Sequence, residues 1–336
     1  MINLCMAFHP PPQMCQICKK SIEFIFVRDH KNADGRFSLY ECKQCQVQLW
    51  VPFKGPPSDW YEKHKAYAVS ELFEPKVFRE YHKEFFKKFK TLPLGSMVLD
   101  LGCGTGEFLN SLCKRGYRAW GVDFNKNSID LAKRFFGLST VYAMNLNDFL
   151  TIPDLPEFDV ITLFEVIEHV DNPKELISNI QKILKPGGFF VLSTPSRDRM
   201  LVNVTEMDFP YHHLTRWNET SIRRLLQGAG FSIEAIHHIE KIAFIYGTLL
   251  GYVSSITQTN LLMRTLSLLN STRVHKRTYE TNLTAGFIFS AMMILARIKG
   301  LLVADLPASL LSLPLIIVDT IKTGGRGDMF IMCRKV

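Results

Sequence analysis

The segment Met97–Phe108 constrains the fold more than any other part of the chain. It contains an apolar run that ends at Leu101, glycines at positions 102, 104 and 106, and then a segment with helical spacing that begins at Glu107. These features predict a buried strand, a tight turn and a helix. Glycines let the backbone turn sharply and let a ligand approach its N–H groups, while a helix N-terminus attracts negative charge. The segment is therefore predicted to bind a ligand.

An acidic residue at the end of the next predicted strand narrows the kind of ligand. Asp123 ends the segment Arg118–Asp123, and an acid at this position can accept hydrogen bonds from both hydroxyls of a ribose. A glycine loop followed by a strand-terminal acid at this spacing indicates a nucleoside-containing cofactor.

Four motifs in the same order resemble those of class I S-adenosylmethionine-dependent methyltransferases. They occupy residues 98–108, 121–123, 158–173 and 183–195. The resemblance is nearest to the branch that holds ubiquinone-biosynthesis O-methyltransferases and many bacterial sugar and small-molecule methyltransferases. It implies S-adenosyl-L-methionine as cofactor and an α/β fold: a Rossmann-like, doubly wound sheet of seven strands. The alternation of predicted strands and helices over this part of the chain agrees with a doubly wound sheet.

The resemblance also implies which residues contact the cofactor. The glycine loop is expected to admit the methionine end and Asp123 to bind the ribose, while Asp100 is expected to order the loop. Asn145 stands where family members usually place an acid near the adenine, so the adenine contact stays open among Asn145, the Leu146 backbone and Asp148. The predicted cofactor-binding residues are Asp100, Gly102, Cys103, Gly104, Gly106, Asp123, Phe124, Asn145, Leu146, Phe164 and Glu165.

Acids and histidines follow two later strands at the predicted ligand edge of the sheet. Glu165, Glu168 and His169 can hold a divalent cation or supply a base for a substrate hydroxyl, and the equivalent cluster of the related ubiquinone methyltransferases is implicated in metal binding. His212 and His213 lie in a loop after the fifth strand. One of them is expected to be the general base and the other structural, so the candidate catalytic residues are His169, His212 and His213.

Two C-x2-C pairs precede this domain. Cys15 with Cys18 and Cys42 with Cys45 can supply four thiolates to one tetrahedral Zn²⁺, which is the pattern of a structural site. Residues 21–27 and 37–41 read as short strands around a polar turn, which predicts a zinc ribbon. Free thiols or a redox pair are the alternative.

Proline, glycine and the motif positions suggest five segments. They are a zinc-ribbon-like domain (1–56), a helical cap or linker (57–93), the methyltransferase core (94–240), an apolar helical insertion (241–326) and the last strand of the core sheet (327–336). The insertion has two interpretations: helices that form a lid over the substrate pocket, or amphipathic helices on a membrane surface. None of its apolar stretches is an uninterrupted span long enough to cross a bilayer.

The net charge and the N-terminal sequence indicate which partners the protein can bind and where in the cell it is expected. The net charge of +8 suits anionic partners, but a solubilising surface charge is the favoured explanation. No basic run interleaved with aromatics suggests a nucleic-acid groove, and Met1–Phe8 does not read as a signal peptide. A cytoplasmic protein is expected, with membrane association on the cytoplasmic face as an open possibility. The oligomeric state is not determined by the sequence.

The predicted activity is transfer of a methyl group to a small-molecule acceptor. The expected nucleophile is a hydroxyl oxygen of a sugar, glycan precursor or lipid-linked metabolite, and a quinone or phenolic hydroxyl is the alternative. Two other classes compete with this interpretation. A nicotinamide dehydrogenase is disfavoured because the loop lacks the third glycine of G-x-G-x-x-G. A non-catalytic zinc-ribbon adaptor is disfavoured by the intact glycines and Asp123.

Overall fold

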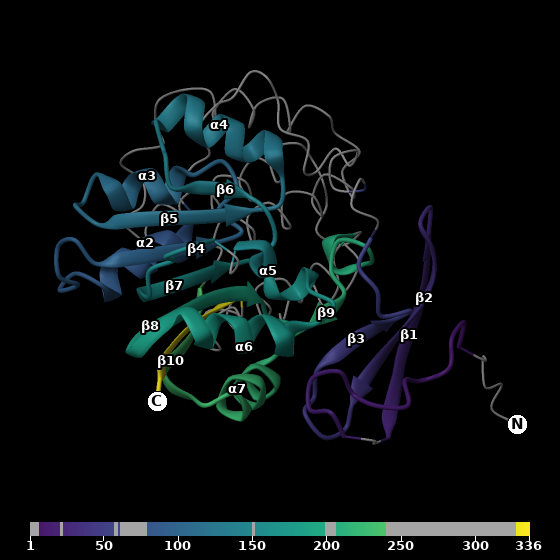
Figure 1. Cartoon of the computed structure of the whole chain (residues 1–336). Coiled ribbons are helices and arrows are strands. Elements are labelled where there is room, and N and C mark those ends of the chain that lie inside the picture. Colours follow the sequence, from purple (N-terminus) through teal and green to yellow (C-terminus); the bar gives the residue numbers. More distant parts are fainter. Residues whose placement is uncertain are drawn as a thin grey trace, which may run out of the picture. The chain divides into compact units, whose positions relative to one another are not determined.

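A mixed sheet forms the centre of the fold, and its strand order is β10-β11-β8-β7-β4-β5-β6 (Figure 1). This computed structural model describes residues 7–20, 23–56, 60, 79–149, 152–198, 206–239 and 327–336. The predicted insertion at 241–326 and most of the cap at 57–93 lie outside the described residues. The chain divides into two units, and the unit described here comprises Met1–Glu240 with Arg326–Val336.

The seven strands confirm the predicted fold class. β4, β5, β6, β7 and β8 pair in parallel, whereas β11 is antiparallel to both β8 and β10. The strands are β4 (Met97–Leu101), β5 (Arg118–Asp123), β6 (Val141–Ala143), β7 (Phe158–Phe164), β8 (Leu184–Pro195), β10 (Phe231–Ile239) and β11 (Asp328–Lys335).

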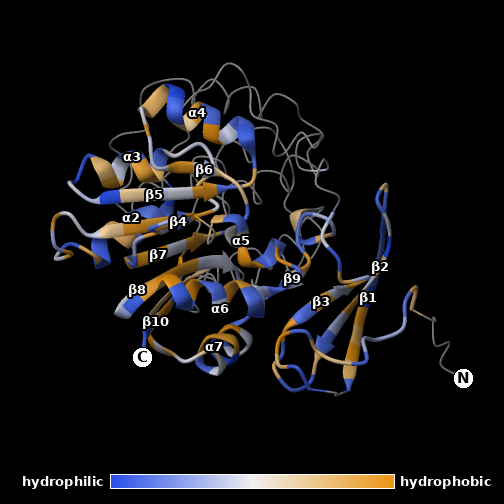
Figure 2. Ribbon diagram, viewed as in Figure 1, coloured by the Kyte–Doolittle hydropathy of each residue, from blue (hydrophilic) through white to orange (hydrophobic). Residues whose placement is uncertain are grey.

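Helices cover both faces of this sheet because successive strand residues point to opposite sides. In β4, Leu99 packs in one hydrophobic cluster with α6 and α7, while Val98 packs in the other with α2, α3 and α4. The apolar colouring of the strands in Figure 2 agrees with burial on both faces. The helices are α2 (Glu80–Lys88), α3 (Glu107–Cys113), α4 (Lys126–Phe136), α5 (Leu146–Phe149), α6 (Pro173–Ile183) and α7 (Glu219–Gly228).

Three helices that begin near the carboxyl ends of the parallel strands have an asparagine as N-cap. The side chain of Asn125 caps α4, and that of Asn172 caps α6 with Pro173 at the first position. Asn218 forms a capping box with Ser221 at the start of α7. Gly137 ends α4 in the left-handed conformation.

The N-terminal ribbon is a four-stranded sheet with the order β1-β2-β3-β9. β1 (Phe24–Asn32) and β2 (Gly35–Cys42) form the predicted hairpin, but both extend further than the sequence suggested, and β3 (Gln48–Val51) was not predicted. The fourth strand, β9 (Thr215–Arg216), comes from the methyltransferase part and pairs with β3. The two parts of this unit therefore share a sheet.

Two glycine- and asparagine-containing segments are regular structure. Residues 185–188 belong to β8, which begins at Leu184, and the segment after β6 contains α5. Two short 3-10 helices, η1 (Ile167–His169) and η2 (Glu206–Asp208), lie at the ligand edge. Among the helices in the described part of the chain, none combines the length and the apolar character needed to cross a membrane.

Candidate functional site

The glycine loop joins β4 to α3 in the conformation that its sequence predicts. Gly102, Gly104 and Gly106 have φ values of +80°, +52° and +82°, a region in which a side chain is strained. A Cβ on Gly104 would meet no atom within 4 Å, whereas one on Gly102 would lie 2.5 Å from Val166 Cγ2. The loop is therefore packed at Gly102 and open at Gly104, where a ligand can approach the backbone.

Asp123, at the end of β5, closes this loop. Its Oδ2 accepts a hydrogen bond of 2.8 Å from Gly104 N, and its Oδ1 accepts one of 2.8 Å from Asn125 N. Burial raises the pKa of Asp123, and the two backbone hydrogen bonds oppose that rise. The carboxylate thus sits beside the open glycine, and each of its oxygens already has a backbone partner.

Asp100 lies beneath the loop rather than in it. It is 4% exposed, and Thr162 Oγ1 on β7 donates a 2.6 Å hydrogen bond to its Oδ1. Burial raises the pKa of Asp100 to about 7, and the negative charge of Asp123 adds to the rise. The Asp100 side chain is thus hydrogen-bonded to the neighbouring strand β7.

The other predicted cofactor-binding residues at this edge of the sheet differ in solvent exposure. Phe124 is 56% exposed, whereas Cys103 and Phe164 are each 7% exposed. Asn145 is exposed and bonded to Asp148 at the start of α5: its Nδ2 donates to Asp148 Oδ2 (2.7 Å) and its Oδ1 accepts from Asp148 N (2.9 Å). Leu146 begins α5.

Glu165 stands at the end of β7 in an unusual backbone conformation. Its φ is +56°, a value that costs free energy for a residue with a side chain and that concentrates at functional sites. Ser193 Oγ on β8 donates a 2.8 Å hydrogen bond to Glu165 Oε1. Glu165 is thereby held against the ends of β7 and β8.

Glu168, His169 and His213 form a cluster that could hold a metal ion, with one ligand atom from each residue within 4.8 Å of the others. Glu168 Oε1 lies 3.9 Å from His169 Nε2 and 4.0 Å from His213 Nε2. Thr194 Oγ1 donates to Glu168 Oε2 (3.0 Å), while the buried Oε1 has no hydrogen-bond partner among the described residues. The two imidazoles thus converge on one carboxylate oxygen.

This arrangement differs from the predicted acidic cluster and divides the predicted histidine pair. His213 is 6% exposed and joins Glu168, whereas the ring of His212 packs against Trp60 at a centroid distance of 5.3 Å. The backbone carbonyl of His212 accepts a hydrogen bond from His169 Nδ1. That bond leaves Nε2 of His169 as the unprotonated nitrogen when the ring is neutral.

Electrostatics in the cluster favour neutral imidazoles. Burial, together with any positive charge on His213, lowers the pKa of His169 to about 3. Burial and the negative charge of Glu165 raise the pKa of Glu168 well above its usual range. Without a bound cation these shifts favour a protonated Glu168 and neutral imidazoles, whereas a cation among these groups would favour the ionised carboxylate.

The four ribbon cysteines fit a tetrahedral metal. Their Sγ atoms lie within 4.8 Å of one another, with Cys15 and Cys45 3.6 Å apart and Cys18 and Cys42 3.8 Å apart. Zn–S bonds of about 2.3 Å in a tetrahedron place the thiolates about 3.8 Å apart. The donor set and its spacing are thus those of a closed Zn²⁺ site.

Sequence reasoning missed the residues that support this edge. The ring of Tyr81 on α2 stacks on Phe164 at 5.0 Å, and burial with the nearby charge of Glu165 raises its pKa. Asp208 and Arg216 flank the histidine loop and are 2% and 5% exposed. The only signal in the sequence was their position on either side of His212 and His213.

Comparison with known proteins identifies the family. A family model described as "Methyltransferase domain" matches residues 72–236. The ubiquinone biosynthesis O-methyltransferase of Coxiella burnetii is 31% identical over 202 residues, which cover 53% of this chain and 82% of that protein. The chain belongs to the S-adenosylmethionine-dependent methyltransferases.

Two further matches are a second curated relative and a solved structure. The ubiquinone biosynthesis O-methyltransferase of Psychrobacter cryohalolentis is 31% identical over 185 residues, covering 49% of this methyltransferase and 69% of the relative. A crystal structure of an S-adenosylmethionine-dependent methyltransferase from Archaeoglobus fulgidus covers 77% of this chain and 95% of its own, at 20% identity and a TM-score of 0.43.

Proposed function

We propose that this methyltransferase transfers the methyl group of S-adenosylmethionine to a hydroxyl oxygen of a small-molecule acceptor. The observation that carries the proposal is the convergence of His169 Nε2 and His213 Nε2 on the buried Oε1 of Glu168. Two members of this cluster, Glu168 and His169, follow β7, the strand next to β4 and its glycine loop. A hydroxyl oxygen needs to lose its proton or have it polarised during transfer, whereas an already deprotonated nucleophile needs no such group.

The cofactor is proposed to bind where the loop is open. Gly104 gives space for the methionine end, and the carboxylate of Asp123 receives the ribose hydroxyls. When bound, S-adenosylmethionine supplies an electrophilic methyl group on its sulfonium. The exposed ring of Phe124 and the start of α5 at Asn145 and Leu146 are proposed to border the adenine.

The protein then mainly positions the acceptor and excludes water. As the oxygen forms its bond to the methyl carbon, the carbon–sulfur bond breaks and the acceptor proton leaves. The cluster offers this proton the unprotonated Nε2 of His169, the less buried imidazole, with a side chain 20% exposed. The low pKa of this ring opposes protonation, so the charge of Glu168, with Oε1 3.9 Å from Nε2, would have to stabilise the imidazolium. Alternatively, Glu168, His169 and His213 can hold a divalent cation that binds the hydroxyl oxygen, because two neutral imidazoles and a carboxylate are a suitable donor set.

The names of the relatives support an oxygen acceptor and favour a phenolic one. A phenol ionises near pH 10, so it demands less of a base than a sugar hydroxyl does. A sugar or lipid-linked hydroxyl is the second class to test. Zn²⁺ is proposed to occupy the four ribbon cysteines in a structural role, since that site leaves no open position.

Formation of S-adenosylhomocysteine in the presence of a catechol, a sugar nucleotide or a primary amine tests the proposal. We expect product with a hydroxyl acceptor, and a strong loss of kcat in Glu168→Gln. Loss of activity on mild chelation that leaves the zinc content unchanged, with recovery on adding Mg²⁺ or Mn²⁺, would select the cation mechanism. Methylation of the amine alone would contradict the proposal.

Calorimetric titration with S-adenosylhomocysteine tests the cofactor site separately. We expect Asp123→Asn to weaken binding by roughly 10- to 100-fold, because a hydrogen bond to a charged group is worth about 1.5–3 kcal/mol. Asp130→Asn is the matched control, since Asp130 is exposed on α4 and pairs with Lys126. Equal affinity in both variants would contradict the ribose assignment.

A further inference from the structure

We propose that the N-terminal ribbon positions His213 in the methyltransferase site, through the side chains of Gln48, Arg216 and Asp208. The inference rests on the proposed role of the Glu168–His169–His213 cluster. In this proposal Asp208, Arg216 and Gln48 are positioning residues. The ribbon then contributes to the reaction in addition to binding a metal.

His213 lies between two buried carboxylates. Its Nε2 faces Glu168 Oε1 at 4.0 Å, and its Nδ1 faces Asp208 Oδ1 at 3.7 Å. Asp208 is 2% exposed and Glu168 is 1% exposed. Each carboxyl group attracts a proton to the ring nitrogen that it faces. Asp208 is the nearer of the two and pairs with Arg216, which favours its ionised form, so we expect the proton on Nδ1 and the lone pair of Nε2 directed at Glu168. Asp208 thus selects the tautomer that the cluster needs.

Asp208 is in turn held from two sides. Arg216 Nε lies 3.6 Å from Asp208 Oδ1, and Trp50 Nε1 on β3 donates a 2.9 Å hydrogen bond to the backbone carbonyl of Asp208. Because Asp208 and Arg216 are both almost fully buried, their ion pair is weakly screened and its geometry is sensitive to the partners of each side chain.

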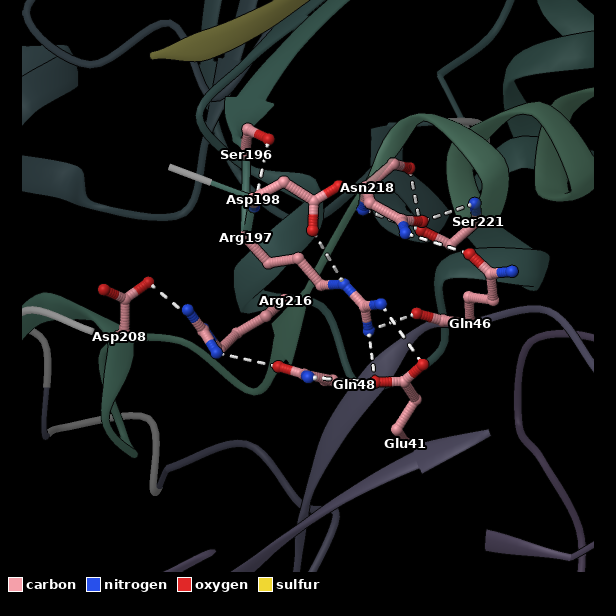
Figure 3. A network of polar contacts seen from close by, with 10 residues as sticks. All are labelled: Glu41, Gln46, Gln48, Ser196, Arg197, Asp198, Asp208, Arg216, Asn218 and Ser221. Atoms are coloured by element: carbon pink, nitrogen blue, oxygen red, sulfur yellow. Dashed lines mark hydrogen bonds and ion pairs between the residues drawn. The ribbon is translucent and has the colours of Figure 1, made fainter. Parts of the chain in front are cut away.

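The ribbon supplies the partner of Arg216. Arg216 Nη1 donates a 2.7 Å hydrogen bond to Gln48 Oε1 on β3, and the backbones of the same two residues pair between β3 and β9 (Figure 3). A second backbone hydrogen bond, from Trp50 N to Leu214 O (3.0 Å), continues this pairing, and Leu214 N donates to Glu168 O (2.8 Å). The ribbon edge is therefore bonded directly to the loop that carries His213.

Contacts at the second cysteine pair fix the ribbon itself. Gln46 follows Cys45, and its carbonyl accepts a 2.6 Å hydrogen bond from Arg197 Nη1, just after β8. Arg197 also pairs with Glu41 (3.0 Å), and Glu41 accepts a 3.2 Å hydrogen bond from Gln48 Nε2 (Figure 3). A continuous set of polar contacts thus runs from the cysteine knuckle through Gln48 to Arg216 and Asp208.

The tautomer of His213 tests the proposal without any acceptor. The full chain is labelled with ¹⁵N-histidine, loaded with zinc and kept free of other divalent cations. Long-range ¹H–¹⁵N spectra then report which ring nitrogen carries the proton, and His213→Gln assigns the signal. We expect protonated Nδ1 in the wild type. In Gln48→Leu and in the isosteric Asp208→Asn, the Nδ1 signal should move toward that of an unprotonated nitrogen.

Two further variants separate positioning from general damage to the ribbon. Gln48→Glu keeps an oxygen opposite Arg216 and should restore the wild-type signal. Lys43→Ala removes an exposed ion pair with Glu23 within the ribbon and should change nothing. Binding of S-adenosylhomocysteine should stay at the wild-type level in all of these variants, which also shows that they fold.

An unchanged His213 signal in Asp208→Asn would overturn the proposal, and so would an equal change in Lys43→Ala. If Gln48→Leu does not bind S-adenosylhomocysteine, the result is decided by Asp208→Asn together with Gln48→Glu. Failure of the proposed function would show differently: His213→Gln and Glu168→Gln would then retain wild-type kcat, whatever the tautomer of His213 in the spectra.

Discussion

Asp100 is a buried acid whose ionisation opposes folding. Its pKa is raised from 3.8 to about 7 in the folded protein. The folded state therefore retains a proton that the unfolded state loses between pH 4 and 7, so the contribution of Asp100 to stability is present below pH 4 and is lost as the pH rises to 7. A difference of about three pKa units corresponds to at most roughly 4 kcal/mol.

Asp100→Asn should remove this dependence, because asparagine does not titrate and can still accept the hydrogen bond from Thr162. We expect the stability of the variant relative to wild type to rise by a few kcal/mol between pH 4 and pH 8. Urea denaturation of the ligand-free proteins at both pH values measures this. A difference in stability that is the same at both pH values would show that Asp100 does not titrate in this window.

Gly121, in the middle of β5, allows the close approach of α3 and the glycine loop. An added Cβ would lie 2.4 Å from Leu109 Cδ1 and 2.7 Å from Cys103 Sγ. Gly121→Ala should therefore cost about 1–3 kcal/mol through overpacking. Gly228→Ala is the matched control: its Cβ would meet nothing within 4 Å, and alanine at this helical position should be neutral or slightly stabilising. Equal thermal denaturation midpoints would refute the packing argument.

At the scale of elements, α7 depends on its N-cap more than α6 does. Asn218 is 6% exposed, accepts a 2.9 Å hydrogen bond from Ser221 N and donates to Gln46 of the ribbon. Asn172 caps α6 with a longer bond of 3.5 Å from Glu175 N, in an exposed position. We expect Asn218→Ala to lower the free energy of unfolding by about 2 kcal/mol and Asn172→Ala by about 0.5–1 kcal/mol. Chemical denaturation compares them, and a larger loss in Asn172→Ala would contradict this ranking.

The elements that could be predicted are those with a strong local pattern. β4 ends at Leu101, α3 begins at Glu107 and β5 spans Arg118–Asp123, as the sequence predicted, because buried strands read as apolar runs and glycines mark the turns. β9 could not be predicted, because two residues carry no periodicity and its pairing with β3 joins distant parts of the chain. This pairing is also what places Gln48 beside Arg216.

Single residues of the candidate site were also beyond what a local sequence pattern can predict. The sequence predicted that one of His212 and His213 is functional and the other structural, but the two residues lie in a loop without periodicity, so only the tertiary structure shows which of them lies near Glu168. In the structure His213 is the one that lies beside Glu168 and Asp208, and its role as the base stays a prediction. Asp208 and Arg216 have no motif of their own, and only tertiary packing shows that they are buried together.

On the scale of the whole described unit, the ribbon and the methyltransferase core share one hydrophobic cluster. Cys45, Val47 and Leu49 of the ribbon belong to the same cluster as Trp217 and Ile222 of the core. The shared sheet adds backbone hydrogen bonds to this packing. Because these residues of the ribbon and of the core pack in one cluster, we expect the two parts to unfold together.

Replacing zinc with Co²⁺ makes this testable, since Co²⁺ absorption at the four cysteines reports the ribbon while far-UV circular dichroism reports mainly the core. We expect both signals to change at one midpoint, and addition of S-adenosylhomocysteine to raise that midpoint for both, because a ligand of the folded core stabilises everything that unfolds with it. Chelation should lower the circular dichroism midpoint as well, since metal binding to the cysteines contributes free energy of folding, and added Zn²⁺ should restore it. Two independent domains would give a different result: S-adenosylhomocysteine would not change the midpoint of the Co²⁺ absorption, and chelation would not change the midpoint of the circular dichroism. The ribbon would then not position His213.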